Sequence, residues 1–169
     1  LMKIITLIGG FLVLVISSTY LKTFKIYNIE YPILILSSIL GMMVMISSND
    51  LIVFYMGLEL QSLALYVLAT YNRDQLKSSE AGLKYFVLSA LSSGLLLYGC
   101  SLVYGFSGST NFDIISNQLN SDEYFLTFGI VFILVGLAFK ISAVPFHMWA
   151  PDVYEGSPTT VTLFFTIVP

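Results

Sequence analysis

Residues 125–148 read FLTFGIVFILVGLAFKISAVPFHM, an apolar stretch that contains one lysine, Lys140, and one proline, Pro145. A helix needs about 20 apolar residues to cross a bilayer, because a chain without water around it must satisfy its backbone hydrogen bonds internally. This stretch is long enough to do so. It therefore predicts a membrane-spanning helix with a cation inside it.

The composition extends this interpretation to the whole chain. Of the 169 residues, 57% are hydrophobic and 10% are charged, and the mean hydropathy of +0.88 lies above the range of soluble globular proteins. The net charge is -3 and there is no basic run. Nucleic acid is excluded as a partner, because binding its phosphates requires clustered Lys and Arg. Membrane lipids are expected around the chain.

The hydropathy pattern predicts an all-α, polytopic transmembrane helix bundle, with residues 1–169 as a single transmembrane domain. Five full helices and a partial sixth are expected at about 4–21, 32–48, 51–71, 81–105, 125–148 and 159–169. Pro145 removes a backbone donor and its ring clashes with the carbonyl of Ile141, so the fifth helix should break near Pro145. Such a break could line a hydrated path or be a structural kink.

Loop charges predict how the bundle is oriented. The loops at 22–31 and 72–80 carry basic residues, whereas the opposite connections carry acidic residues without Lys or Arg. The positive-inside rule assigns the basic side to the cytoplasm or the mitochondrial matrix. The residues used are Lys22, Lys25, Arg73 and Lys77 on the basic side, and Asp50, Asp113, Asp122 and Glu123 on the other.

The last apolar segment is short. From Thr159 to Pro169 it covers about 11 residues, or roughly 16 Å, whereas a crossing needs about 30 Å. Carbonyl groups left unpaired in hydrocarbon cost several kcal/mol unless protein surrounds them. We therefore expect another polypeptide, or a continuation, to complete this layer after Pro169.

Glu59 lies eight residues past Leu51, about 12 Å into its expected helix and near the bilayer midplane. Charged residues at this depth cost about 2.5–3.5 kcal/mol and usually mark ion or proton pathways. Glu59 is either a proton-transfer group or one half of a buried salt bridge that clamps two helices. The first interpretation is favoured, because replacing a buried ion pair by apolar residues is often neutral or stabilising.

Lys140 shares a helix face with Gly129 and Gly136, whose spacing lets a neighbouring helix approach closely. In such a dry site, a lysine whose carboxylate partner can move is suited to load and release a proton. The alternative is that Lys140 extends toward the membrane interface near Trp149 and has no function.

Lys84 and His147 are further candidates for proton transfer. Lys84 lies about one turn into its expected helix, and Glu80 precedes it by four residues, a spacing that equally fits an ordinary surface pair. Histidine titrates near neutral pH, so His147 suits a relay between Lys140 and water. It equally suits an interfacial position beside Trp149.

No cofactor is expected in this chain. Cys100 is the single cysteine and His147 the single histidine, so the sequence predicts neither an internal disulfide nor a metal site. It also contains no Gly-rich phosphate loop, nucleophile constellation or cysteine cluster. Any redox chemistry is expected elsewhere.

Three stretches carry a resemblance to a known family: GLELQSLALYVLATY at 57–71, SSEAGLKYFVLSALSSGLLLYG at 78–99 and GLAFKISAVPFHMWAPDVYEGSPTTVT at 136–162. They closely resemble, in order and spacing, chain 2 of NADH:ubiquinone oxidoreductase, the antiporter-like membrane-arm subunit of respiratory complex I. The resemblance runs from about Asn49 to Pro169, and residues 1–48 fit only in pattern.

The resemblance implies that Glu59 and Lys140 are the central proton-transfer pair and that Lys84 is the family's additional helix lysine. It implies the other membrane-arm subunits of complex I as partners, with NADH, FMN, iron–sulfur clusters and ubiquinone handled elsewhere in the complex. The sequence VPFHMWAPDVYEGSPT at 144–159 is more similar to mitochondrial members of the family than to most bacterial members. This similarity indicates the mitochondrial inner membrane. The bacterial plasma membrane is the alternative.

The chain departs from the family at its ends. It has fewer expected helices than family members, and the lysine that typically follows the proline matching Pro169 is absent. We therefore expect a split subunit, in which a second polypeptide starts near that lysine and completes the last helix. The alternative functions are a subunit of a multi-subunit cation/proton antiporter and a structural or assembly fragment.

Overall fold

The computed structural model describes residues 1–23, 28–118 and 124–169, and these residues form α-helices, with one isolated bridge between Asp50 and Asn111 and no strand. The predicted all-α, polytopic class is confirmed. The helices are α1 (Met2–Thr23), α2 (Glu30–Ser47), α3 (Leu51–Ala69), α4 (Leu76–Ser107), α5 (Phe112–Gln118), α6 (Tyr124–Lys140), α7 (Trp149–Gly156) and α8 (Thr159–Ile167).

Four of these helices, α1 to α4, are long and apolar enough to cross a membrane. α4 extends beyond the expected 81–105 at both ends. α6 has 17 residues and covers about 26 Å, which is less than the hydrocarbon thickness of about 30 Å. The short helices α5 and α7 lie in segments where no helix was expected.

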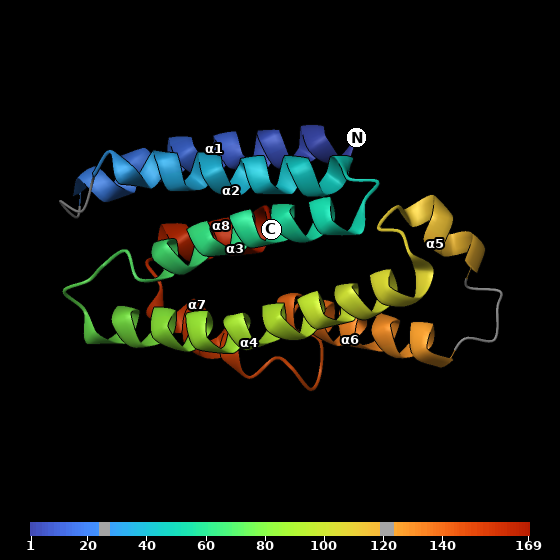
Figure 1. Ribbon diagram of the computed structural model, residues 1–169. Coiled ribbons are helices and arrows are strands. Elements are labelled where there is room, and N and C mark those ends of the chain that lie inside the picture. Colours follow the sequence, from blue (N-terminus) through green and yellow to red (C-terminus); the bar gives the residue numbers. More distant parts are fainter. Residues whose placement is uncertain (24–27, 119–123) are drawn as a thin grey trace.

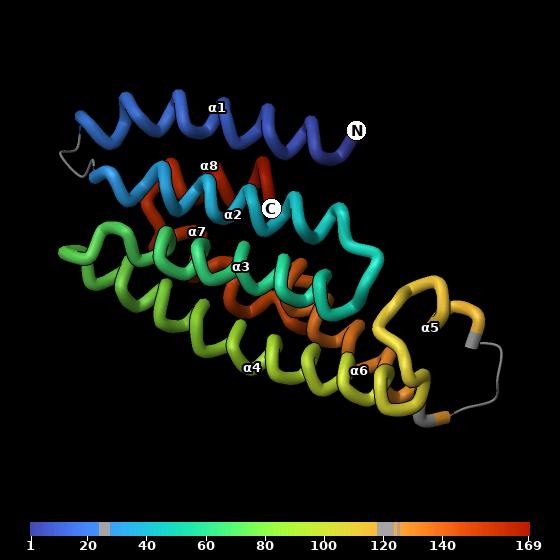
Figure 2. Tube along the Cα trace, turned by 45° about the horizontal axis from the view of Figure 1, so that its top comes forward, coloured from blue at the N-terminus to red at the C-terminus, as the bar shows by residue number. Residues whose placement is uncertain are grey.

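The helices form a bundle with their axes roughly aligned. α1 and α2 lie together along one side, α3 lies beside α2, and α4 follows α3 (Figure 1). α6 packs along α4, while α8 returns to contact α1 (Figure 2). α3 is thus placed between the N-terminal helices and the α4–α6 pair.

The expected helix over 125–148 ends at Lys140, and a helix resumes only at Trp149. Residues 141–148 lie outside any helix, and all of them except Ala143 are in turns. Pro145 cannot donate a backbone hydrogen bond, and the residue before a proline is disfavoured in helical conformation. The break predicted near Pro145 is therefore present, and it spans a whole segment rather than a single kinked turn.

Glycines bring α4 and α6 together. A Cβ atom added at Gly136 would lie 2.6 Å from the Cβ of Leu96, and one at Gly99 would lie 2.8 Å from the carbonyl oxygen of Gly129. Such distances leave no room for a side chain. The predicted close approach at Gly129 and Gly136 is confirmed, and α4 is the neighbouring helix.

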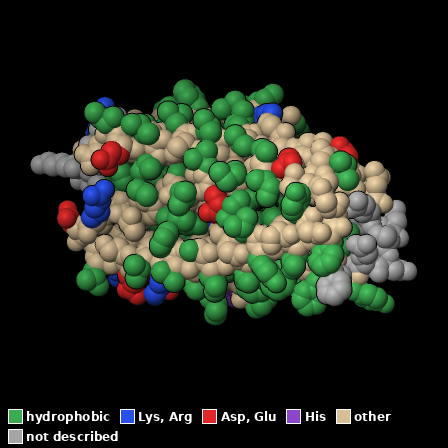
Figure 3. Space-filling view, in the orientation of Figure 1, with side chains coloured by type: hydrophobic (Ala, Val, Ile, Leu, Met, Phe, Trp, Pro, Cys, Tyr) green, Lys and Arg blue, Asp and Glu red, His purple; other side chains and the backbone are tan. Residues whose placement is uncertain are grey.

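Charged side chains gather mainly at the end of the bundle that holds the α1–α2 and α3–α4 connections, and hydrophobic side chains cover much of the remaining face (Figure 3). At that end Arg73 lies 3.9 Å from Glu30. Asp50 and Asp113 lie at the opposite end, as the loop charges predict. Three charged residues used in that prediction lie outside the described residues: Lys25, Asp122 and Glu123.

Candidate proton-transfer site

The start of α3 sets the depth of Glu59. Asp50 caps this helix, and its Oδ1 accepts a hydrogen bond from the backbone N–H of Ile52 at 2.9 Å. A further hydrogen bond from the Thr110 hydroxyl holds the pKa of Asp50 below its ordinary value. Glu59 follows about 12 Å along the helix, and its side chain is 21% exposed.

Lys140 is the last residue of α6, and the backbone explains why the helix stops there. Ser142 N–H donates to the Phe139 carbonyl at 3.1 Å, and Ala143 N–H donates to the Ala138 carbonyl at 2.8 Å. This is the Schellman pattern, with Ser142 in the left-handed position (φ 57°) that glycine usually occupies. The carbonyl end of a helix attracts a cation, so the end of α6 stabilises the Lys140 ammonium group.

Three helices converge on the Glu59–Lys140 pair. The Lys140 Nζ lies 3.6 Å from Glu59 Oε1, and the lysine side chain is 11% exposed. Lys140 Nζ also donates to Tyr66 Oη at 3.0 Å and to Ser89 Oγ at 3.4 Å. Ser93, one turn after Ser89 on α4, donates to Glu59 Oε1. The two ionisable residues that the sequence singled out therefore meet inside the bundle.

Lys84 lies at a separate site on the surface between α4 and α7. Its Nζ lies 2.9 Å from Glu80 and 2.8 Å from Asp152, and its side chain is 43% exposed. The Glu80 contact is the one expected from the spacing, and the Asp152 contact is additional. Lys84 is thus a bridge between two surface carboxylates and lies apart from the Lys140 pair.

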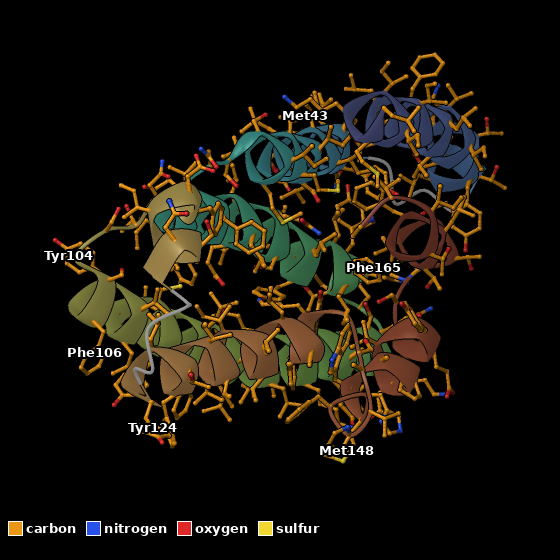
Figure 4. All side chains as sticks on the ribbon, turned by 90° about the vertical axis from the view of Figure 1, so that its right-hand side faces the viewer. Met43, Tyr104, Phe106, Tyr124, Met148 and Phe165 are labelled. Atoms are coloured by element: carbon orange, nitrogen blue, oxygen red, sulfur yellow. The ribbon has the colours of Figure 1, made fainter. Side chains whose placement is uncertain are left out.

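His147 lies in the turn segment between α6 and α7, and its side chain is exposed. Its neighbour Met148 is also exposed and points away from the bundle (Figure 4). In the part of the chain that the structure describes, no hydrogen bond or ion pair joins the His147 side chain to Lys140 or Glu59. A relay through His147 would need water between the two side chains.

Lys140 also lines a cavity of about 470 Å³ between α3 and the C-terminal helices. Gln61 and Ser62 of α3, Trp149 of α7 and Phe165 of α8 contribute to its wall, and Phe165 points into the interior of the bundle (Figure 4). The wall is mainly apolar but includes the polar side chains of Gln61, Ser62, Ser142 and Lys140, and water occupies a cavity only beside such polar groups. Lys140 therefore borders both Glu59 and this cavity.

Two residues around this site, Tyr66 and Trp149, were not predicted from the sequence as functional residues. Tyr66 follows Glu59 by seven residues, close to two helical turns, so that spacing could have placed it on the same face. Trp149 Nε1 donates to the Phe139 carbonyl at 3.1 Å, and its ring stacks on Tyr85 with centroids 4.6 Å apart. No spacing rule predicts the contact between Trp149 and Phe139, because the two residues lie on opposite sides of the break at 141–148.

Metal chemistry finds no support in this site. Over residues 1–23, 28–118 and 124–169, no three His, Cys, Asp or Glu side chains are close enough together to hold a metal ion. Cys100 is buried and free. What the arrangement offers chemically is one carboxylate, one ammonium group and the hydroxyls around them.

A family profile described as "NADH:quinone oxidoreductase/Mrp antiporter, TM" matches residues 48–169. Because the match covers most of the chain, the chain belongs to this transmembrane family. The resemblance from Asn49 onward is thereby confirmed.

Relatives and solved structures agree with this assignment. The chain is 83% identical over 168 residues to NADH-quinone oxidoreductase subunit N of Pelagibacter ubique, a match that covers 99% of this chain and 36% of that protein. It resembles a chain of respiratory complex I from Thermus thermophilus, with TM-score 0.78 and 35% identity over 99% of this chain and 36% of the other. A chain of the membrane-bound sulfane sulfur reductase, an archaeal respiratory membrane complex, gives TM-score 0.83 and 27% identity, covering 97% and 34%. The chain thus spans about a third of the length of these relatives.

Proposed function

We propose that this chain is part of a proton-translocating membrane-arm subunit of a respiratory NADH–quinone oxidoreductase, with Glu59 and Lys140 as its central proton-transfer pair. The observation that carries the proposal is the half-buried contact of 3.6 Å between these two side chains. A lone charge at this depth costs about 2.5–3.5 kcal/mol, and intramembrane ionisable residues commonly serve ion or proton pathways. Membership of the oxidoreductase and antiporter family supports the same function.

In the proposed mechanism, Glu59 stabilises the charged form of Lys140 while the two are close. Separation of the pair during the enzyme's cycle removes this stabilisation and lets Lys140 release its proton toward the next carrier. Moving one charge through 100 mV requires about 2.3 kcal/mol. Losing one partner of a buried ion pair changes the free energy by about 3–5 kcal/mol. A small movement of either side chain is therefore sufficient to drive the transfer.

Lys84 and His147 remain predicted proton-transfer groups on the basic side of the bundle. Lys84 is bridged to Glu80 and Asp152 at the surface, and His147 is exposed. Both therefore need water or another group between them and Lys140. The role of Lys84 is proposed on the resemblance and that of His147 on its residue type, and neither role rests on a direct contact with Lys140.

The test is Lys140→Met in the assembled enzyme, reconstituted into proteoliposomes. We expect proton pumping to be lost, because methionine keeps most of the side-chain volume and removes the charge. Lys77→Met is the matched control, because Lys77 lies at the surface with its side chain 77% exposed. An unchanged proton-to-electron stoichiometry in Lys140→Met would exclude the mechanism.

The partners follow from the same proposal. Other membrane-arm subunits would surround the chain, and NADH, FMN, iron–sulfur clusters and ubiquinone would be bound elsewhere in the complex. The second polypeptide after Pro169 stays a prediction. Mass spectrometry of a native detergent extract would test these partners together, because it identifies every chain that copurifies.

The chain is proposed to be a multi-pass protein of a bacterial plasma membrane. Four helices are long and apolar enough to cross, and the relative at 83% identity comes from a bacterium. This relative favours the bacterial membrane over the mitochondrial inner membrane that the wording of 144–159 indicated. Fractionation of cells of the source organism would distinguish the two.

A second candidate is a subunit of a cation/proton antiporter, because the family description includes the Mrp antiporter. Sodium-dependent proton exchange without NADH oxidation would favour it. The remaining alternative is a structural fragment in which Glu59 and Lys140 only join two helices. In that case Glu59→Gln would disturb assembly more than turnover.

A further inference from the structure

The closest polar contact of Lys140 is not Glu59. Its Nζ lies 3.0 Å from Tyr66 Oη, against 3.6 Å from Glu59 Oε1. Hydrogen bonds from nitrogen to oxygen have lengths of about 2.7–3.2 Å, so the Tyr66 contact is a hydrogen bond and the Glu59 contact is a longer ion pair. Ser89 Oγ adds a second, weaker acceptor at 3.4 Å.

Glu59 has a competing partner as well. The Ser93 hydroxyl donates to Glu59 Oε1, the same oxygen that faces Lys140. Both members of the pair are thus held by neutral hydroxyl groups on their neighbours. This arrangement explains why two opposite charges in a buried site do not close to the distance of about 2.8 Å that charge-assisted hydrogen bonds adopt.

We propose that Tyr66, assisted by Ser89, is a positioning residue that holds the Lys140 ammonium group apart from Glu59 and keeps the pair poised to separate. This inference rests on the proposed function of the pair. An ammonium group has three donors and no acceptor, so in a water-poor site it needs neutral oxygen atoms when it leaves its carboxylate. Tyr66 supplies one such oxygen from its hydroxyl, which accepts from Lys140 Nζ at 3.0 Å.

The position of the Tyr66 hydroxyl is fixed by packing. The residue is 6% exposed, and its ring makes edge contacts with Tyr85 at 4.8 Å and Phe86 at 5.7 Å between centroids. Both partners belong to α4, the helix that also carries Ser89 and Ser93. The Tyr66 hydroxyl is therefore fixed between α3 and α4, the two helices that also hold Glu59. Lys140 lies at the end of α6, next to the break.

A small movement is enough to exchange the two partners of Lys140. Closing the ion pair from 3.6 Å to about 2.8 Å requires a shift of roughly 0.8 Å. Lys140 has a flexible four-carbon stem, whereas the Tyr66 ring is locked between α4 side chains. The lysine is thus the group that moves, and the phenol oxygen is the fixed acceptor that receives it.

The test compares Tyr66→Phe with Tyr85→Phe in the assembled enzyme. Each substitution removes the hydroxyl of a buried residue and keeps the ring, but of the two hydroxyls only that of Tyr66 accepts a hydrogen bond from Lys140. A hydrogen bond to a charged group is lost in Tyr66→Phe, so we expect the rate of proton pumping to fall about tenfold. Tyr85→Phe is expected to stay within about twofold of the unsubstituted enzyme.

An infrared measurement separates positioning from a purely structural role. The carboxylate band of Glu59 is identified by its loss in Glu59→Gln. If Tyr66 holds the pair open, this band shifts in Tyr66→Phe, because Lys140 closes onto the carboxylate, and it stays in place in Tyr85→Phe. Equal spectra in the two phenylalanine variants would overturn the inference.

The outcomes distinguish this inference from the function on which it rests. Loss of pumping in Lys140→Met together with no effect of Tyr66→Phe would retain the pair and overturn the role of Tyr66. An unaffected Lys140→Met enzyme would overturn both. If Tyr66→Phe does not assemble, Ser89→Ala replaces it, with a smaller shift of the Glu59 band expected from its longer contact, and no shift counts against the inference.

Discussion

Lys140 and Lys84 both face carboxylates, and they differ in contact distance and in exposure. Lys84 lies within 2.9 Å of Glu80 and 2.8 Å of Asp152 and is 43% exposed, whereas Lys140 lies 3.6 Å from Glu59 and is 11% exposed. Water screens the surface contacts, so they contribute little despite their short distances. The less exposed Glu59–Lys140 pair interacts more strongly at a longer distance, because the surrounding dielectric is lower. Depth, rather than contact distance, therefore separates the two sites.

The largest expected difference between the two sites is in stability. Glu59→Gln leaves the Lys140 ammonium group buried without a counter-charge, and we expect a loss of about 3 kcal/mol in the free energy of unfolding. Asp152→Asn is the matched control, because Lys84 keeps Glu80 and water. The measurement is denaturant-induced unfolding of the purified protein in detergent. Equal losses in both variants would remove the distinction between the sites.

A second prediction concerns the helix contact that holds Lys140 at its depth. Gly136 packs against α4 without space for a Cβ atom, so Gly136→Ala should destabilise the bundle by about 1–3 kcal/mol. Gly94 lies on α4 with nothing within 4 Å of an added Cβ, and Gly94→Ala should instead stabilise its helix by about 0.5–1 kcal/mol. Unfolding curves of the two variants check the opposite signs. A stability loss in Gly94→Ala of the same size would contradict the packing argument.

The smallest expected effect is at Asp50, at the end of the bundle away from Lys84. The Thr110 hydrogen bond lowers the pKa of Asp50 in the folded protein. Asp50 therefore stabilises the fold at pH above its unfolded-state pKa, and this contribution is lost as the pH falls through the lowered folded-state pKa. Asp50→Asn and Thr110→Val should both weaken the acid dependence of unfolding, measured from neutral pH to about pH 3. If unfolding of the two variants depends on pH as it does in the unsubstituted protein, the Thr110 hydrogen bond does not lower the pKa of Asp50.

Much of the fold could be predicted from the sequence because apolar runs of about 20 residues have few stable conformations in a membrane. Glu59 and Lys140 could be singled out for the same reason, since a charge inside such a run is costly. The spacing of Gly129 and Gly136 also predicted a close helix contact. Each of these predictions uses the sequence of a single helix and needs no knowledge of how the helices pack.

Features that join several segments could not be predicted in this way. Asp152 reaches Lys84 only because α7 folds back on α4 after the break. The length of that break depends on the Schellman turn at Ser142 as well as on Pro145. A serine in the left-handed position carries no sequence pattern that marks it, because glycine is the usual residue there.

The sequence by itself determined that this chain crosses a membrane, that Glu59 and Lys140 lie deep within apolar segments, and which family it resembles. Those properties follow from hydropathy and residue identity along the chain. Only the tertiary structure decided that Glu59 meets Lys140 at 3.6 Å, that Tyr66 lies closer to the lysine, and that Lys84 and His147 lie apart. The reason is that each contact depends on how the helices pack against one another. Patterns within one segment of the sequence do not predict that packing.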